Sequence, residues 1–144
     1  MSKYTEIRPS DQLKDYVECF WIMKKSDSNA MVDDIIIPNG CCEIVFPSGK
    51  GYLRSNDGIN FNKIIEPAVI GQSDEFFLLK EFQDDSVDFG VRFTPYGFAP
   101  FINEASKMTN KTEGLYHLFG ELGLNLVKEL SDHQSIDDKI KCLE

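Results

Sequence analysis

The chain has 144 residues, of which 42% are hydrophobic and 12% aromatic, and this composition is sufficient for one compact folded core. With 15 Lys and Arg against 24 Asp and Glu, the formal net charge is -9, which repels a phosphate backbone and disfavours direct binding of nucleic acid. The chain begins with no apolar leader, and no run approaches the roughly 18 uncharged residues of a membrane span, so we expect a cytoplasmic protein without membrane contact.

A short helix followed by a buried strand is expected near the N-terminus. Ser10 is a suitable helix cap, and Leu13, Tyr16 and Val17 have the spacing of one helical face. Residues 18–23 are nearly all apolar, which is typical of a strand buried on both sides.

The clearest turn signal is Pro38-Asn39-Gly40, which lies between two apolar runs at residues 32–37 and 41–46. Because Pro followed by Asn-Gly favours a tight turn, we expect these two runs to pair as a hairpin. In the second strand Glu43 is flanked by apolar neighbours.

More short strands separated by turn residues follow. The last of them alternates, with Val87, Phe89, Val91 and Phe93 on one face and Asp88, Gly90 and Arg92 on the other. About seven short strands indicate a barrel or a sandwich. The strands expected after the hairpin are residues 52–54, 68–72, 75–82 and 86–93.

After residue 96 the apolar spacing becomes helical, so we expect a β-barrel over residues 1–96 and a helical tail of the same domain over residues 97–144. A helical turn is expected at residues 98–102, and a further helix at Ser135. Since that last helix has no stop signal before Glu144, we expect the natural chain to continue. Between them lies a helical stripe of Leu115, Leu118, Phe119, Leu122, Leu126 and Leu130. This stripe either packs on the barrel, which we prefer, or forms a dimer surface.

The residues that often carry catalysis are poorly placed for it. His117 and His133 both lie in the helical tail, so a histidine-rich metal centre in the sheet is excluded, and we expect neither metal nor cofactor. No G-x-S-x-G motif or phosphate-binding loop is present. Without a C-x-x-C pair, the cysteines are interpreted as reduced and mostly buried thiols: Cys19, Cys41, Cys42 and Cys142.

Charged residues inside apolar strands are the remaining candidates for a site. Glu43 and Arg92 either point outward into water or line the mouth of the barrel beside Trp21, Phe46 and Tyr96. In the second case the five residues offer aromatic surface and polar anchors to a small molecule.

Four blocks of the sequence resemble, in order, the sensor domain of bacterial AraC-type transcription regulators. Residues 9–21 are similar to P-x-x-x-L-x-x-Y-V-x-x-x-W, and residues 38–46 to P-D-G-x-x-E-I-V-F, with Asn39 in place of Asp. Residues 69–71 match V-x-G, and residues 90–97 match G-V-R-F-x-P-x-G.

The resemblance implies a mainly β domain, a cupin-like β-barrel followed by two or three helices, that binds an unidentified small-molecule effector and often forms a homodimer. It also implies that DNA is bound only by a helix-turn-helix domain, absent here and expected after residue 144. We therefore expect a regulator and not an enzyme. The alternative is a small metal-independent barrel enzyme, an isomerase or lyase, with Glu43 as general base.

Overall fold

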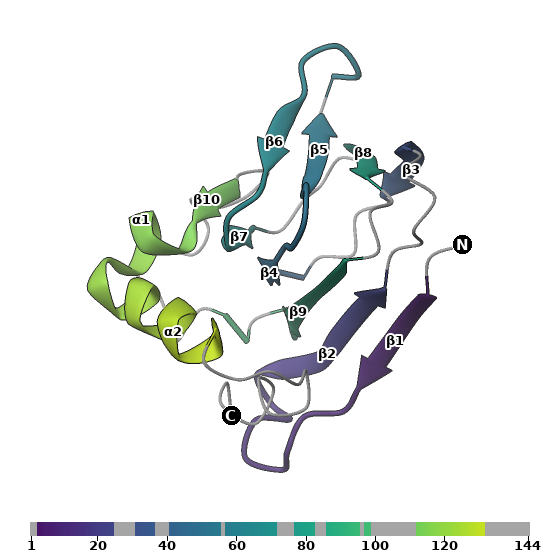
Figure 1. Cartoon of the computed structure of the whole chain (residues 1–144). Helices are drawn as coiled ribbons and strands as arrows, with labels where there is room; N and C mark the ends of the chain where they lie inside the picture. The colour runs from purple at the N-terminus through teal and green to yellow at the C-terminus, as the bar shows by residue number, and fades with distance from the viewer. Residues whose placement is uncertain are drawn as a thin grey trace.

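The computed structural model describes residues 3–24, 31–36, 41–55, 57–71, 77–82, 86–95, 97–98 and 112–131. The described part is mainly β, as the sequence predicts, with helices only at its C-terminal end (Figure 1). Its strands are β1 (Lys3–Ile7), β2 (Val17–Lys24), β3 (Met31–Ile36), β4 (Glu43–Phe46), β5 (Tyr52–Ser55), β6 (Asn62–Ile64), β7 (Ala68–Ile70), β8 (Phe77–Phe82), β9 (Val87–Phe93) and β10 (Thr112–Gly114). Its helices are α1 (Leu115–Phe119) and α2 (Glu121–Ser131).

The strands form two antiparallel sheets. The larger has the order β1-β2-β9-β4-β7-β10, and the smaller has the order β3-β8-β5-β6. No strand pairing among the described residues joins the two, so the expected closed barrel is not observed there. One apolar cluster, built on Val45, Tyr52 and Ile70 with Trp21 and Leu79 against it, contains residues of both sheets and lies between them.

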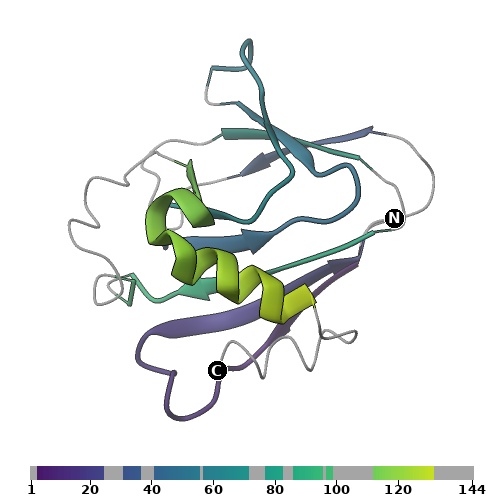
Figure 2. The ribbon, with the colours of Figure 1, turned by 60° about the vertical axis from the view of Figure 1, so that its left-hand side comes forward.

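The larger sheet has its second apolar face under the helices. Phe89, Val91 and Phe93 of β9 belong to one buried cluster together with Ile44 of β4 and Leu115 of α1. In Figure 2, α2 crosses in front of this sheet. The predicted alternation of β9 is therefore confirmed, and the larger sheet is covered on one side by helices and on the other by the smaller sheet.

The predicted hairpin of residues 32–37 and 41–46 is wrong. Strand β3 pairs with β8 in the smaller sheet, whereas β4 pairs with β7 and β9 in the larger one. Residues 37–40, which contain the Pro-Asn-Gly sequence, lie outside the described residues. A turn signal indicates where the chain reverses but does not decide which strands pair, and here β4 pairs with two apolar strands farther along the chain.

The expected N-terminal helix is also not formed. The carbonyl oxygen of Leu13 accepts hydrogen bonds from the Tyr16 and Val17 N–H groups, at 2.9 and 2.8 Å, which makes a single turn. Val17 then pairs with Phe93 as the first residue of β2. This pairing places the Val17 side chain in the same buried cluster as Phe93.

The C-terminal segment contains a strand that the sequence did not predict, β10, which pairs with β7. The helical stripe is confirmed over α1 and α2, with a break at Gly120, where the backbone has φ of 61°. Leu118, Phe119 and Leu126 pack against the core, whereas Leu122 is 71% exposed, so most of the stripe serves the sheet. Most of the helical turn at 98–102 and the helix at Ser135 lie outside the described residues.

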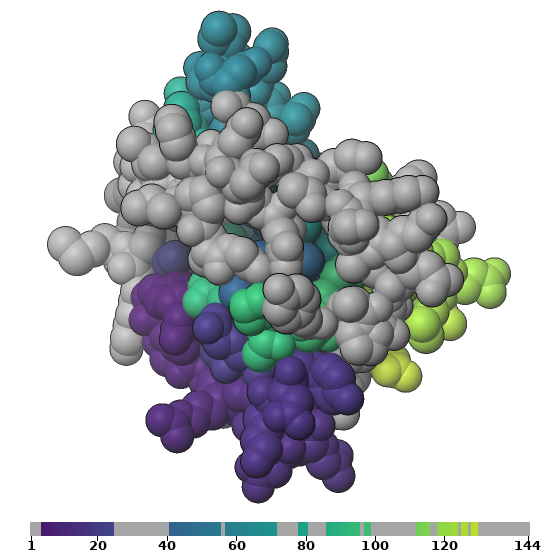
Figure 3. All heavy atoms as spheres, turned by 180° about the vertical axis from the view of Figure 1, so that it is seen from behind, coloured from purple at the N-terminus to yellow at the C-terminus, as the bar shows by residue number. Residues whose placement is uncertain are grey.

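The loop between β5 and β6 projects from one end of the molecule, as Figures 1 and 3 show. Asp57 organises this loop, because its Oδ1 accepts hydrogen bonds from the N–H groups of Ile59 and Asn60, each at 2.8 Å. Ile59 is 81% exposed at its tip. Among the described helices none has the length and apolar character needed to cross a membrane.

Candidate ligand-binding site

Glu43 and Arg92, two of the candidate site residues, form an ion pair. The Arg92 Nε donates to Glu43 Oε1 at 2.7 Å, and the two residues are directly opposite each other in the β9–β4 pairing. Neither points fully into water, since their side chains are 22% and 20% exposed. Burial lowers the pKa of Arg92, but the hydrogen bond to Glu43 and the charge of Glu43 together raise this pKa by more. The net shift is therefore upward, and Arg92 stays charged.

Residues of β1 and β2 complete a polar cluster around this arginine. Arg92 Nη1 lies 3.2 Å from Glu6 Oε1 and 3.6 Å from Glu18 Oε2, and Nη2 donates to the Tyr4 hydroxyl at 3.0 Å. Burial raises the pKa of Tyr4 to about 12, because the opposing effect of Arg92 is smaller. One guanidinium therefore connects four strands at the edge of the space between the sheets.

Trp21 lies on the same face as this pair. Its ring stacks with Tyr4 at a centroid distance of 6.3 Å and covers the backbone of Gly90. Its Nε1 is buried and makes no hydrogen bond to the described residues. Three of the five predicted site residues, Trp21, Glu43 and Arg92, are thus brought to one face of the larger sheet.

Phe46, a fourth predicted site residue, does not join them. Phe46 points to the opposite face, where it stacks on Phe89 with ring centroids 4.7 Å apart. The pleat requires this, because Phe46 lies an odd number of positions from Glu43 in β4. Tyr96 lies outside the described residues.

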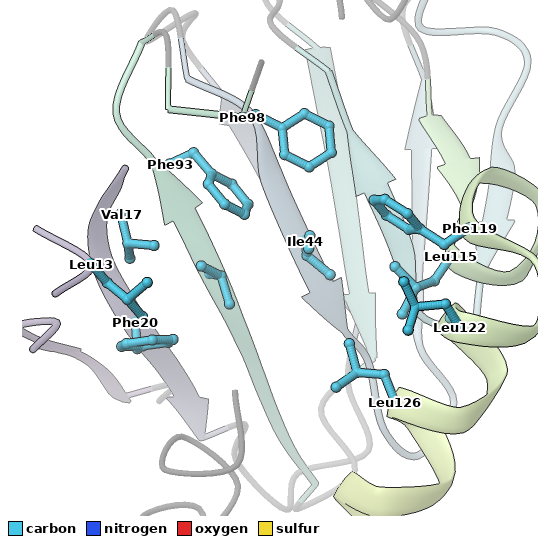
Figure 4. A pocket seen from close by; sticks show the side chains of 12 residues that line it. Leu13, Val17, Phe20, Ile44, Phe93, Phe98, Leu115, Phe119, Leu122 and Leu126 are labelled. Atoms are coloured by element: carbon cyan, nitrogen blue, oxygen red, sulfur yellow. The ribbon is translucent and has the colours of Figure 1, made fainter. Parts of the chain in front are cut away.

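A cavity of about 280 Å³ lies on the helix-covered face of the larger sheet. In Figure 4 the labelled side chains from the sheet and the helices point toward one another across it. The lining residues are, from the sheet side, Leu13, Val17, Phe20, Ile44, Val91, Phe93 and Phe98, and from the helices, Leu115, Phe119, Leu122, Gly123 and Leu126. Eleven of the twelve carry hydrocarbon side chains, and the other is glycine.

Two turns hold the sheet side of the cavity together. Tyr16, in the turn that carries Leu13, accepts a hydrogen bond from the Thr94 N–H at 2.9 Å through its carbonyl oxygen. The Gly97 N–H donates to the Thr94 carbonyl at 2.9 Å, and a Cβ at Gly97 would lie 2.0 Å from the Tyr16 oxygen. The T-P-Y-G sequence after β9 therefore fixes where Phe98 lies relative to Leu13.

Sequence reasoning missed this cavity. Its signals were present, because the apolar face of β9 and the helical stripe both supply lining residues. The same patterns are typical of an ordinary core, and a pattern does not show whether two apolar faces meet completely.

The described residues offer little support for cysteine chemistry or metal binding. Cys19, Cys41 and Cys42 are buried, as predicted, and Cys142 lies outside the described residues. Burial raises the pKa of Cys19 to about 11, so its thiol is protonated at neutral pH. Within the described ranges no group of three His, Cys, Asp or Glu could hold a metal ion.

Comparison with known proteins gives one family. A family model described as a domain of unknown function (DUF6597) matches residues 5–113. Searches of curated proteins and of solved structures found no match.

Proposed function

The chain belongs to the DUF6597 family, and we propose that it is the effector-sensing domain of a bacterial AraC-type transcription regulator. The observation that carries the proposal is the apolar cavity between the larger sheet and helices α1 and α2. The four sequence blocks that resemble the AraC-type sensor give the proposal its class. The cupin-like fold that this class implies is part of the proposal, and two facing antiparallel sheets support it.

The position of the cavity suggests how sensing would work. A ligand there touches both the sheet, through Val91 and Phe93, and α2, through Leu122 and Leu126. Its binding energy therefore depends on how α2 lies against the sheet, and a ligand shifts a conformational equilibrium only through such differential affinity. In the proposed regulator, the DNA-binding domain follows this helical segment, and the protein is cytoplasmic.

The net charge agrees with a domain that senses a ligand and leaves DNA binding to another domain. At -9, the domain gains nothing from approaching DNA, so base reading would fall to a separate helix-turn-helix domain. The domain would then act on DNA only by positioning that partner.

The enzyme alternative has no comparable support. Glu43 is not among the residues that line the cavity, and its Oε1 already accepts a short hydrogen bond from Arg92. A general base must reach a substrate proton, whereas the Glu43 carboxylate is hydrogen-bonded to a permanent cation.

The test is DNA occupancy by the full-length protein in its own cell, measured by crosslinking and sequencing. We expect discrete promoter sites, and a reporter fused to one of them that responds to Leu122→Trp at the cavity but not to Ile59→Trp in the β5–β6 loop. Both positions are exposed aliphatic residues, so the two variants carry a similar risk to folding. A full-length protein that occupies no promoter would show that the regulator proposal is wrong.

A further inference from the structure

We infer that the cavity under α2 takes an uncharged, apolar small molecule of roughly eleven non-hydrogen atoms. The inference rests on the proposed function in treating this cavity as the effector site. It differs from the sequence-based expectation, which placed the ligand beside Glu43 and Arg92 on the other face of the sheet.

The chemistry of the lining disfavours a charged group inside the cavity. Every side chain at the cavity is a hydrocarbon, so an ion placed there loses its hydration and gains no counter-charge from them. The charged pair cannot serve, because Glu43 and Arg92 alternate with Ile44 and Val91 and point to the opposite face. A polar ligand such as a sugar would likewise leave its hydroxyl groups without partners among these side chains.

The size of the cavity selects a small molecule. A dry apolar cavity of about 150 Å³ holds benzene, and by proportion about 280 Å³ holds roughly eleven carbon atoms. Two turns of a partner helix, about 10 Å wide and 11 Å long, would occupy on the order of 860 Å³. The space is therefore too small for an inserted helix and matches a bicyclic or medium-chain compound.

The cavity has a buried end and an open end. Leu115 is 2% exposed and Phe98 is also 2% exposed, whereas Leu122 is 71% exposed on α2. In Figure 4, Leu122 lies between Phe119 and Leu126 along the helices. A ligand thus enters beside α2 and replaces water around Leu122 when it binds.

Titration of the purified chain with three probes tests the ligand class. Naphthalene has ten carbon atoms, 1-decanol has eleven non-hydrogen atoms, and decanoate is the charged counterpart of decanol. We expect both neutral probes to raise the unfolding temperature and to bind saturably by calorimetry. Decanoate should bind at least about tenfold more weakly, because a carboxylate at the apolar rim of the open end is more costly to desolvate than the decanol hydroxyl. Equal affinity for decanol and decanoate would overturn the inference. Failure of both neutral probes to bind would also overturn it.

Variants locate the binding. Val91→Phe places a phenyl ring in the cavity from the centre of the sheet, and Leu122→Trp closes its open end, so each should weaken decanol binding by at least about tenfold. Ile59→Trp is the matched control and should leave the affinity unchanged. Because Leu122 is exposed, its variant keeps the test decisive if Val91→Phe does not fold.

Equal binding by wild type, Leu122→Trp and Ile59→Trp would place the probe elsewhere and overturn the inference. These measurements are independent of DNA. If neutral probes bind but the protein occupies no promoter, the inferred ligand class stands and the regulator proposal is wrong. If the protein occupies promoters but no probe binds, the regulator proposal stands and the inferred ligand class is wrong.

Discussion

Cys19 shows how burial controls chemistry at a single residue. Its pKa is raised to about 11 by burial, and a thiol reacts as the thiolate. At pH 8 about 0.1% of such a thiol is ionised, compared with about a quarter of a free cysteine of pKa 8.5. We expect alkylation of Cys19 by iodoacetamide to be at least about a hundredfold slower in the native chain than in guanidinium.

The rate at which Cys19 is alkylated should rise with pH. Because the native pKa lies above the unfolded value, the native rate should rise about tenfold per pH unit from pH 8 towards pH 11, while the unfolded rate levels off above about pH 9. Mass spectrometry of the labelled peptides measures both rates. Rapid labelling of Cys19 at pH 8 in the folded state would contradict the buried placement.

Arg92 links neighbouring strands, because its side chain connects β9 to β1, β2 and β4. Arg92→Met keeps much of the apolar stem but leaves Glu43, 20% exposed, without its cation. We expect a loss of about 2 kcal/mol in the free energy of unfolding, since an orphaned and mostly buried carboxylate is costly. Urea unfolding measures it.

Glu18→Gln is the control for this loss. Glu18 lies 3.6 Å from Arg92 and its side chain is 52% exposed, so its substitution should cost less than about 0.5 kcal/mol. Equal effects of the two substitutions would mean that the cluster does not act through Glu43.

The junction of α1 and α2 offers a matched pair of glycines. At Gly120 a Cβ meets nothing within 4 Å, so Gly120→Ala should cost only the strain of a positive φ, about 1 kcal/mol. At Gly123 a Cβ would lie 2.6 Å from the Leu115 carbonyl oxygen, so Gly123→Ala must push α2 away from α1. We expect Gly123→Ala to cost about 2 kcal/mol or more, although alanine favours a helix. Thermal unfolding of both variants decides the order, and a more stable Gly123→Ala would refute the close contact between Gly123 and Leu115.

The sequence predicted the positions of strands and helices better than it predicted which strands pair. Strands β2, β3, β4, β5, β7, β8 and β9 and the helical stripe were located within a few residues, because their apolar patterns depend on nearby positions. Strand β10 was missed since Thr112–Gly114 contains no apolar residue, and its strand conformation comes from pairing with β7. For the same reason the partner of β4 was wrong, because pairing depends on distant strands.

At the scale of the whole molecule, Glu43 and Arg92 could be identified as candidate site residues from charge inside an apolar pattern, whereas the contact between them is a finding of the structure. The cavity could not be predicted from the sequence, since its existence depends on how far α2 lies from the sheet. That distance is set by three-dimensional packing, such as the Gly123 contact with Leu115, and no local pattern records it.

The acidic charge of the whole domain gives a simple prediction. With a net charge of -9, the purified chain should not shift duplex DNA in a gel at low salt, even at micromolar concentration. A basic DNA-binding domain of similar size serves as the positive control. Binding that weakens steeply with added salt would show a cationic surface that the sequence does not indicate.

Gly90 lets the ring of Trp21 rest directly on the backbone of β9, where a Cβ would lie 2.4 Å from that ring. The chain has one tryptophan, so all indole fluorescence comes from this position. The neighbouring Val91 lines the cavity from the other side of the same strand. The protein therefore contains its own optical probe, separated from any guest molecule by a single layer of backbone, and excitation transfer from the indole to a suitable aromatic guest would reveal occupancy without a label.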